Sequence, residues 1–373
     1  MSESSAQQKK LYNLGYLIKL TAAAIKGTQP PEPTDDADFE KLFKICKFHD
    51  IANTVFYAVE KLKTKPEEQL YNKWRDERNM VVHRYMIQTM ESTALKKAFN
   101  ENGIDFMPVK GFPVCALYPK PDYRYMGDLD YLLREKDLKK AGEIVKGMGY
   151  IPDEVDMFHH DEYKKPPFMV VELHHSMLSA SSGKLFYNYY KGFFDKSKNV
   201  GGHEYKMSDE DFYIFQLVHL KKHYDESGTG IRSFLDMYLI NKKFLPNLDK
   251  DYIQAEFEKL NLTQFSDFVK RITAKWFENE DVESLSEDEM YIITSGIYGL
   301  DRHRFENYKK GKTRGEYIKD RLFPSSNWMR ETYPVLKKHG WVLPFTYIHR
   351  LFFRSIKRRQ KIKNEIKVNR KQG

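Results

Sequence analysis

The chain has 373 residues, of which 41% are hydrophobic and 31% charged, a composition typical of a folded globular protein and not of a disordered one. No apolar stretch approaches the roughly 20 residues that cross a bilayer, which excludes a membrane-spanning helix. The two cysteines are too few for a disulfide framework, and the N-terminus lacks a secretory signal pattern, so we expect a cytoplasmic location.

The net charge of +9 is concentrated at one end of the chain. Residues 354–373 carry nine Lys or Arg side chains and one Glu, so the rest of the chain is close to neutral. Such a segment either contacts nucleic acid or an anionic membrane surface, or is plain solvated charge. We therefore treat 351–373 as a basic tail and leave both alternatives open.

The first part of the chain, 1–102, is predicted to be helical. A Pro- and Asp-rich break at 27–40 separates an opening helix from further helical patterns at 39–62. A longer helix is expected over 80–102, ended by Asn102-Gly103. Its apolar side chains repeat at steps of three and four along one stripe: Ile87, Met90, Ala94 and Ala98.

The pattern then changes to short strands around one helix. Strands are expected at 104–109, 128–133 and 169–175, with a helix at 138–148 closed by Gly149. From 186 to about 279 the pattern is helical again.

We therefore predict an α+β fold with a small core between two helical regions. The expected parts are a helical region at 1–102, a core at 103–180, a second helical region at 181–350 and the basic tail.

Two aspartates stand one residue apart in the second predicted strand. Because side chains alternate faces in a strand, Asp128 and Asp130 share one face, opposite Leu129, Tyr131 and Leu133. Two carboxylates on one face repel each other unless a cation lies between them. A D-x-D pattern on a strand is often only a solvated face, so its meaning depends on the neighbouring segments.

A third acidic residue favours a metal site over a solvated strand face as the interpretation of these aspartates. Glu172 alternates with apolar residues in the last predicted strand, and beside Asp128 and Asp130 it would complete a patch of three carboxylates. Oxygen ligands of this kind suit Mg²⁺, which usually keeps waters and substrate phosphates as its other ligands. Such a patch can support an in-line phosphoryl displacement, with one carboxylate deprotonating the attacking group.

The turn after the first strand fits phosphate binding. Gly111 stands between a strand and a helix, where the backbone can approach a ligand and the helix N-terminus offers free N–H groups. Lys110 and Arg124 add positive charge nearby, although each is equally compatible with an ordinary surface position.

These segments resemble the core of the polymerase-beta-like nucleotidyltransferase superfamily. More narrowly, they are similar to a bacterial family of uncharacterised nucleotidyltransferases, across roughly 39–350. The matching residues in the core are Lys110, Gly111, Tyr118, Pro119, Arg124, Gly127, Asp128, Asp130, Gly149, Tyr150, Glu172 and His174. A later helical segment matches through His219, His223, Gly230, Arg232 and Asp236.

The resemblance implies a reaction and its metal. It implies that Asp128 and Asp130 hold Mg²⁺ and the triphosphate of an NTP, with Glu172 as a third ligand or as the base. A nucleoside monophosphate would then pass to a hydroxyl acceptor that the sequence does not identify. One position departs from the superfamily pattern, because Phe112 follows Gly111 where a serine usually grips phosphate. A non-catalytic nucleotide-binding or regulatory protein is therefore the alternative.

Further nucleotide contacts are expected from the later helix. His219 and His223 lie four residues apart, and with Lys222 and Arg232 they could contact phosphate. They could also hold zinc, but the H-E-x-x-H pattern and a cysteine partner are missing. The nucleotide-binding set predicted from the sequence is Lys110, Gly111, Arg124, His219, Lys222 and Arg232.

Overall fold

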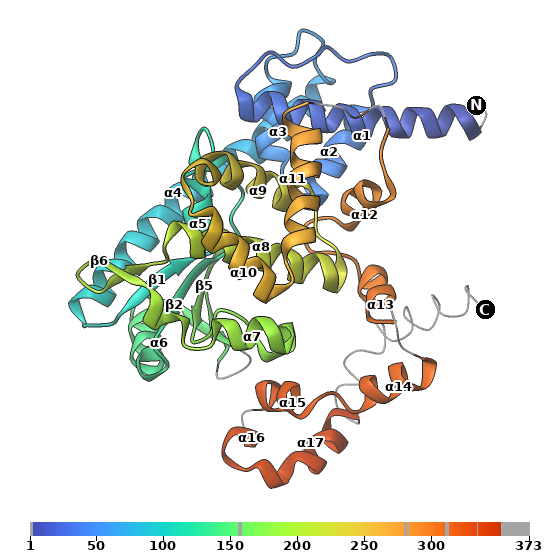
Figure 1. Cartoon of the computed structure of the whole chain (residues 1–373). Helices are drawn as coiled ribbons and strands as arrows, with labels where there is room; N and C mark the ends of the chain where they lie inside the picture. The colour runs from blue at the N-terminus through green and yellow to red at the C-terminus, as the bar shows by residue number, and fades with distance from the viewer. Residues whose placement is uncertain are drawn as a thin grey trace.

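The computed structural model describes residues 3–155, 159–279, 282, 284–309, 313–333 and 335–351. It contains a mixed sheet of seven strands, at the left of the view in Figure 1, with helices packed against it. The strands are β1 (Phe106–Val109), β2 (Leu129–Leu133), β3 (Ile151–Glu154), β4 (His160–Lys165), β5 (Met169–His174), β6 (Lys198–Gly201) and β7 (Glu204–Lys206). The predicted α+β class is confirmed.

The strand order is β3-β4-β5-β2-β1-β7-β6. The β2–β5 and β1–β7 pairs are parallel and the other pairs are antiparallel. The three predicted strands are therefore the central β1, β2 and β5. Pro108 fits inside β1 because β7 pairs with that strand only at Phe106.

Helices make up most of the remaining described chain. The longer ones are α1 (Glu3–Lys26), α2 (Phe39–Phe48), α3 (Ala52–Val59), α4 (Glu68–Glu101), α6 (Leu138–Gly147), α8 (Asp209–Ser227), α9 (Ile231–Phe244), α10 (Lys250–Leu260) and α11 (Thr263–Phe277). Shorter ones are α5 (Gly111–Cys115), α7 (Lys184–Tyr190), α12 (Glu287–Ser295), α13 (Asp301–Lys309), α14 (Arg314–Leu322), α15 (Ser326–Thr332), α16 (Val335–Lys338) and α17 (Leu343–His349).

The prediction of helix throughout 186–279 is wrong at 198–206, where β6 and β7 form a hairpin. Gly201 and Gly202 both have positive φ there, a conformation that favours a turn and ends a helix. The backbone N–H of Phe106 donates to the His203 carbonyl at 2.9 Å, which attaches the hairpin to the sheet. The predicted core boundary at 180 stays a prediction, but the sheet takes two strands from beyond it.

Each face of the sheet packs against its own set of helices. Leu129, Tyr131 and Leu133 face a core that also contains side chains of α4 and α6. Leu132 points the other way, into a core built largely from α1, α3, α8, α9 and α11. The alternation predicted for the second strand therefore holds, and it leaves the Asp130 side of β2 facing the C-terminal helices.

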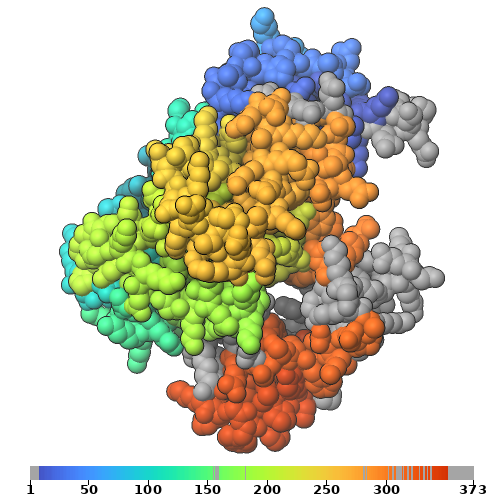
Figure 2. All heavy atoms as spheres, viewed as in Figure 1, coloured from blue at the N-terminus to red at the C-terminus, as the bar shows by residue number. Residues whose placement is uncertain are grey.

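The last described helices lie apart from the sheet. Figure 2 shows the red segments around α15 to α17 as a lobe at the bottom of the view, and α15 packs near residues 180–182. Residues 352–373, nearly all of the predicted basic tail, lie outside the described residues, so its contacts remain a prediction. Among the helices described, none has both the length and the apolar character to cross a bilayer.

Candidate active site

A cavity of about 420 Å³ lies between the sheet and helices α8 and α9. Its floor comes from the end of β1, from β2 and from β5, and its opposite wall comes from the two helices. It is lined by every residue predicted to be catalytic or nucleotide-binding: Lys110, Gly111, Arg124, Asp128, Asp130, Glu172, His219, Lys222 and Arg232. The fold therefore brings together positions more than a hundred residues apart in the chain.

Strand register places two of the three acids side by side. Asp130 of β2 is the direct partner of Glu172 in the parallel strand β5. Asp128 precedes the first residue of β2 and lines the same cavity. Asp130 is buried at 5% exposure and accepts a hydrogen bond from Lys110. Asp128, in contrast, receives no hydrogen bond from the described part of the chain. Three carboxylates thus converge, and one of them has no donor among those residues.

Lys110 is the cation that faces these acids. Its Nζ donates to Asp130 Oδ1 at 2.7 Å and lies 3.5 Å from Glu172 Oε2. His174 lies beneath the same acids, with Nε2 2.9 Å from Asp130 Oδ1 and 3.0 Å from Glu172 Oε2. Lys110 and His174 therefore compensate the buried negative charge, as a buried carboxylate requires.

The surroundings shift the pKa values of Asp128 and Glu172 in opposite directions. Burial, with repulsion from Asp130 and Glu172, raises the pKa of Asp128 to about 7. Burial also acts to raise the pKa of Glu172, but contact with His174 and the charge of Lys110 outweigh it and hold that pKa below its usual range. Burial acts to lower the pKa of Lys110, but the negative charges of Asp130 and Glu172 outweigh it, and the pKa is raised.

The turn at Lys110 is tight and unusual. Lys110 has φ of 58° and ψ of −114°, a positive φ that non-glycine residues seldom adopt. A Cβ on Gly111 would lie 3.1 Å from Arg124 Nη1 and 3.3 Å from Met126 Cγ. Gly111 therefore allows the close approach of a side chain, and the helix that follows has only five residues.

Arg124 lines the cavity with its charge already paired. Its Nε and Nη2 donate to Asp236 Oδ1 and Oδ2 at 2.8 and 2.9 Å, a bidentate ion pair. The Tyr118 hydroxyl donates to the same carboxylate at 2.7 Å. Although burial opposes the charge, Asp236 outweighs it and raises the pKa of Arg124. This cluster joins the core to α9.

The helical wall contributes imidazoles and a second arginine. His219 Nε2 and His223 Nε2 lie 3.2 Å apart on α8, and burial lowers the pKa of both, that of His223 to about 3. Arg232 Nη1 donates to Asp50 Oδ2 at 3.1 Å and to the Tyr125 carbonyl at 3.2 Å. Its Nε is buried without a partner among the described residues. Part of the Arg232 guanidinium is therefore left for another acceptor.

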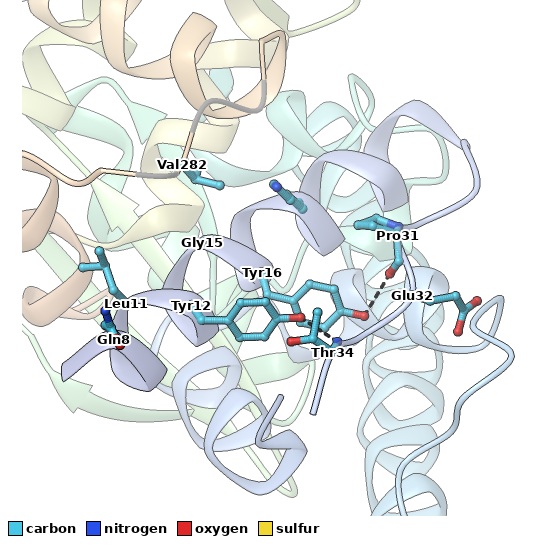
Figure 3. A pocket seen from close by; sticks show the side chains of 10 residues that line it. Gln8, Leu11, Tyr12, Gly15, Tyr16, Pro31, Glu32, Thr34 and Val282 are labelled. Atoms are coloured by element: carbon cyan, nitrogen blue, oxygen red, sulfur yellow. Dashed lines mark hydrogen bonds between the residues drawn. The ribbon is translucent and has the colours of Figure 1, made fainter. Parts of the chain in front are cut away.

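A second cavity, of about 450 Å³, lies beside α1 (Figure 3). Tyr16 donates to the Pro31 carbonyl at 3.0 Å, and the Thr34 N–H donates to the Tyr12 hydroxyl at 2.9 Å. These bonds attach the Pro-rich loop to the helix. Among the described residues that line it, Glu32 is the only carboxylate, so the two cavities differ in the convergence of acids and not in size.

Comparison with known families agrees with the geometry. The model of a family described as uncharacterised nucleotidyltransferases matches residues 35–278, which include every strand and all of the site residues above. The chain belongs to this family. No curated protein gives a significant match. Membership in a nucleotidyltransferase family supports nucleotidyl transfer as the general activity.

Three groups in this nucleotidyltransferase fit a divalent cation. Asp130, Glu172 and His174 each offer a ligand atom, and these atoms lie within 4.8 Å of one another. Two carboxylates with a third beside them, in Asp128, form the hard oxygen donor set that Mg²⁺ prefers. The residues present therefore fit the expected metal.

Several lining residues were not assigned by the sequence analysis. His159 and His160 face the cavity because β4 pairs with β5, placing His160 opposite His174. The alternation of His160, Glu162 and Lys164 was a usable signal for β4, but it is short. Asp236 was part of the family pattern, whereas its pairing with Arg124 needed the fold. Glu226, Tyr298 and Arg304 also line the cavity, and no sequence signal marks them.

Proposed function

We propose that this protein transfers a nucleoside monophosphate from an NTP to a hydroxyl acceptor in a reaction that depends on Mg²⁺. The observation that carries the proposal is the convergence of Asp128, Asp130 and Glu172 in one cavity with Lys110. Family membership supports the class of reaction. The acceptor is defined here only by its hydroxyl group.

Asp128 and Asp130 would hold the cation, with Glu172 as the third ligand. Bound Mg²⁺ supplies charge neutralisation and polarises the phosphoryl oxygens. The acceptor oxygen forms a bond to the α-phosphorus, the α–β bridging bond breaks and pyrophosphate leaves. The acceptor proton passes to a carboxylate or to solvent.

The electrostatics of the cavity favour a division of roles. Glu172, held ionised by His174 and Lys110, is a weak base and is better suited to ligation. Asp128 has a pKa near 7 in the metal-free cavity, and a bound cation would lower it, so Asp128 is also suited to ligation. Lys110, Lys222 and Arg232 would contact phosphate, whereas Arg124, already paired with Asp236, would act mainly by holding the cavity wall in place.

The test is calorimetric binding of each of the four NTPs, with and without Mg²⁺. The proposal expects one or more NTPs to bind only with Mg²⁺ and this binding to be lost in Asp128→Asn/Asp130→Asn. Asp35→Asn, a change of an exposed carboxylate on the loop before α2, is the matched control and should bind as the wild type does.

Two results would count against transfer. Binding that is indifferent to Mg²⁺ and to the double substitution would remove the metal assignment. Mg²⁺-dependent binding without pyrophosphate release across a screen of hydroxyl acceptors would favour the non-catalytic alternative, in keeping with Phe112 in place of serine.

A further inference from the structure

Three imidazoles meet at one end of the β4–β5 pair. His160 and His174 are direct partners across these antiparallel strands, and the His159 carbonyl accepts from the His175 N–H at 3.1 Å. The ring centroids are 4.8 Å apart for His159–His160, 4.9 Å for His160–His174 and 5.3 Å for His159–His174. Strand pairing alone therefore brings the three rings into one triangle.

Each of these rings has a buried nitrogen without a partner. The Nδ1 atoms of His159, His160 and His174 are all inaccessible and accept or donate no hydrogen bond within the described chain. A buried polar atom without a partner is costly, and three of them in neighbouring rings indicate a missing ligand. For His174 the other nitrogen, Nε2, already contacts Asp130 and Glu172, which leaves Nδ1 as the nitrogen that a metal could use.

The three donors are ring nitrogens, and the type of donor decides which metal they suit. Neutral imidazole is a metal ligand, whereas imidazolium is not. Nitrogen donors suit Zn²⁺, Co²⁺ and Ni²⁺ better than Mg²⁺, which prefers oxygen.

We infer that His159, His160 and His174 form a binding site for a first-row transition-metal dication such as Zn²⁺. One ring nitrogen from each lies within 4.8 Å of the others. Zn–N bonds of about 2.0–2.1 Å place tetrahedral nitrogens roughly 3.4 Å apart, so the rings close inward when the ion binds.

The site borders the carboxylate patch and shares His174 with the cation group described above, but its other two donors, His159 and His160, are nitrogen. His159 and His160 line the cavity, so a fourth coordination position would open toward it. Three protein ligands and one open position are the arrangement of catalytic zinc sites. The inference rests on the nitrogen donors alone and holds whether or not nucleotide transfer is correct.

The test uses full-length protein stripped with a chelator and titrated with Co²⁺, whose visible absorption reports nitrogen coordination. We expect one Co²⁺ per chain, displaced by one equivalent of Zn²⁺ and not by a large excess of Mg²⁺. His159→Ala and His160→Ala should each weaken Co²⁺ binding by about 100-fold or more, because loss of an outer-shell partner alone costs about 10–100-fold. His203→Ala, a partly exposed histidine at the other end of the sheet, is the matched control.

Two further variants separate the possible explanations. Asp128→Asn should leave Co²⁺ binding unchanged while removing Mg²⁺-dependent NTP binding, so the two proposals fail independently. His219→Ala/His223→Ala should also leave Co²⁺ binding unchanged, and loss of the signal in that variant would move the site to α8.

Binding of Co²⁺ that survives His159→Ala/His160→Ala, or its displacement by Mg²⁺, would overturn the inference. If the histidine variants do not fold, X-ray absorption on the wild type with bound Zn²⁺ decides the matter. Three imidazole ligands would support the site, and a shell of oxygen alone would refute it.

Discussion

Replacing Asp128 by Asn should stabilise the metal-free protein, and more strongly as the pH rises. Asp128 has a pKa of about 7 when folded, whereas an unfolded Asp has about 3.9. The folded carboxyl holds its proton more tightly, so its ionisation lowers the free energy of unfolding. No stability is lost below the pKa of the unfolded state, and the loss is complete once the pH exceeds the pKa of the folded state.

The magnitude follows from the two pKa values. A difference of about three units corresponds to about 4 kcal/mol at full ionisation, and about half of this develops between pH 5.5 and pH 8. Asn keeps the shape of the protonated acid without titrating. The free energy of unfolding of Asp128→Asn should therefore exceed that of the wild type by about 2 kcal/mol more at pH 8 than at pH 5.5.

The assay is urea denaturation in chelator at several pH values, with Asp35→Asn as the exposed control, for which the difference from wild type should not change with pH. Adding Mg²⁺ and a bound NTP should reverse the order, because only the wild type then gains binding energy. A constant difference between Asp128→Asn and the wild type across the pH range would show that Asp128 ionises normally, and the burial argument would be wrong.

Three other substitutions test the packing of the site. Asp130→Asn should cost about 3 kcal/mol and abolish Mg²⁺-dependent NTP binding, because it removes the carboxylate closest to the Lys110 ammonium, which then keeps only Glu172 at 3.5 Å; an unchanged urea midpoint would contradict this. Asp236→Asn should lower the free energy of unfolding by a similar amount, because it leaves the buried Arg124 charge without its partner. The double variant Arg124→Met/Asp236→Leu should recover much of that stability, whereas equal losses in both variants would assign the effect to packing. Gly111→Ala should cost about 1–3 kcal/mol in denaturation experiments because its Cβ would crowd Arg124, and full stability would show that the guanidinium can shift freely.

The sequence predicted the central part of the sheet because its signals are local. Leu129, Tyr131 and Leu133 alternate with Asp130 strongly enough to define both the strand and its buried face. The sequence predicted that Asp130 and Glu172 lie side by side only on the condition that their strands are neighbours. That condition depends on the parallel pairing of two strands from distant segments.

What the sequence could not predict depends on long-range packing. The expected binding of nucleotide by Arg124 stays a prediction, but its bidentate pairing with Asp236, on a helix 112 residues away in the chain, had no local signal. The β6–β7 hairpin was missed because its strands are short, β6 is fully exposed, and the pairing of β7 with the distant β1 has no local signal. Both depend on contacts that no local periodicity encodes.

The position of Lys110 implies an order of events. Its ammonium lies where the carboxylates of Asp130 and Glu172 would hold a cation, so under the proposed function any arriving ion must displace it. The flexible side chain allows Nζ to swing while the backbone stays anchored at the end of β1. A bare ion would leave the displaced ammonium without a partner, whereas an ion that arrives with its polyphosphate supplies one. The resting cavity would therefore discriminate against free cations and admit the metal and the nucleotide together.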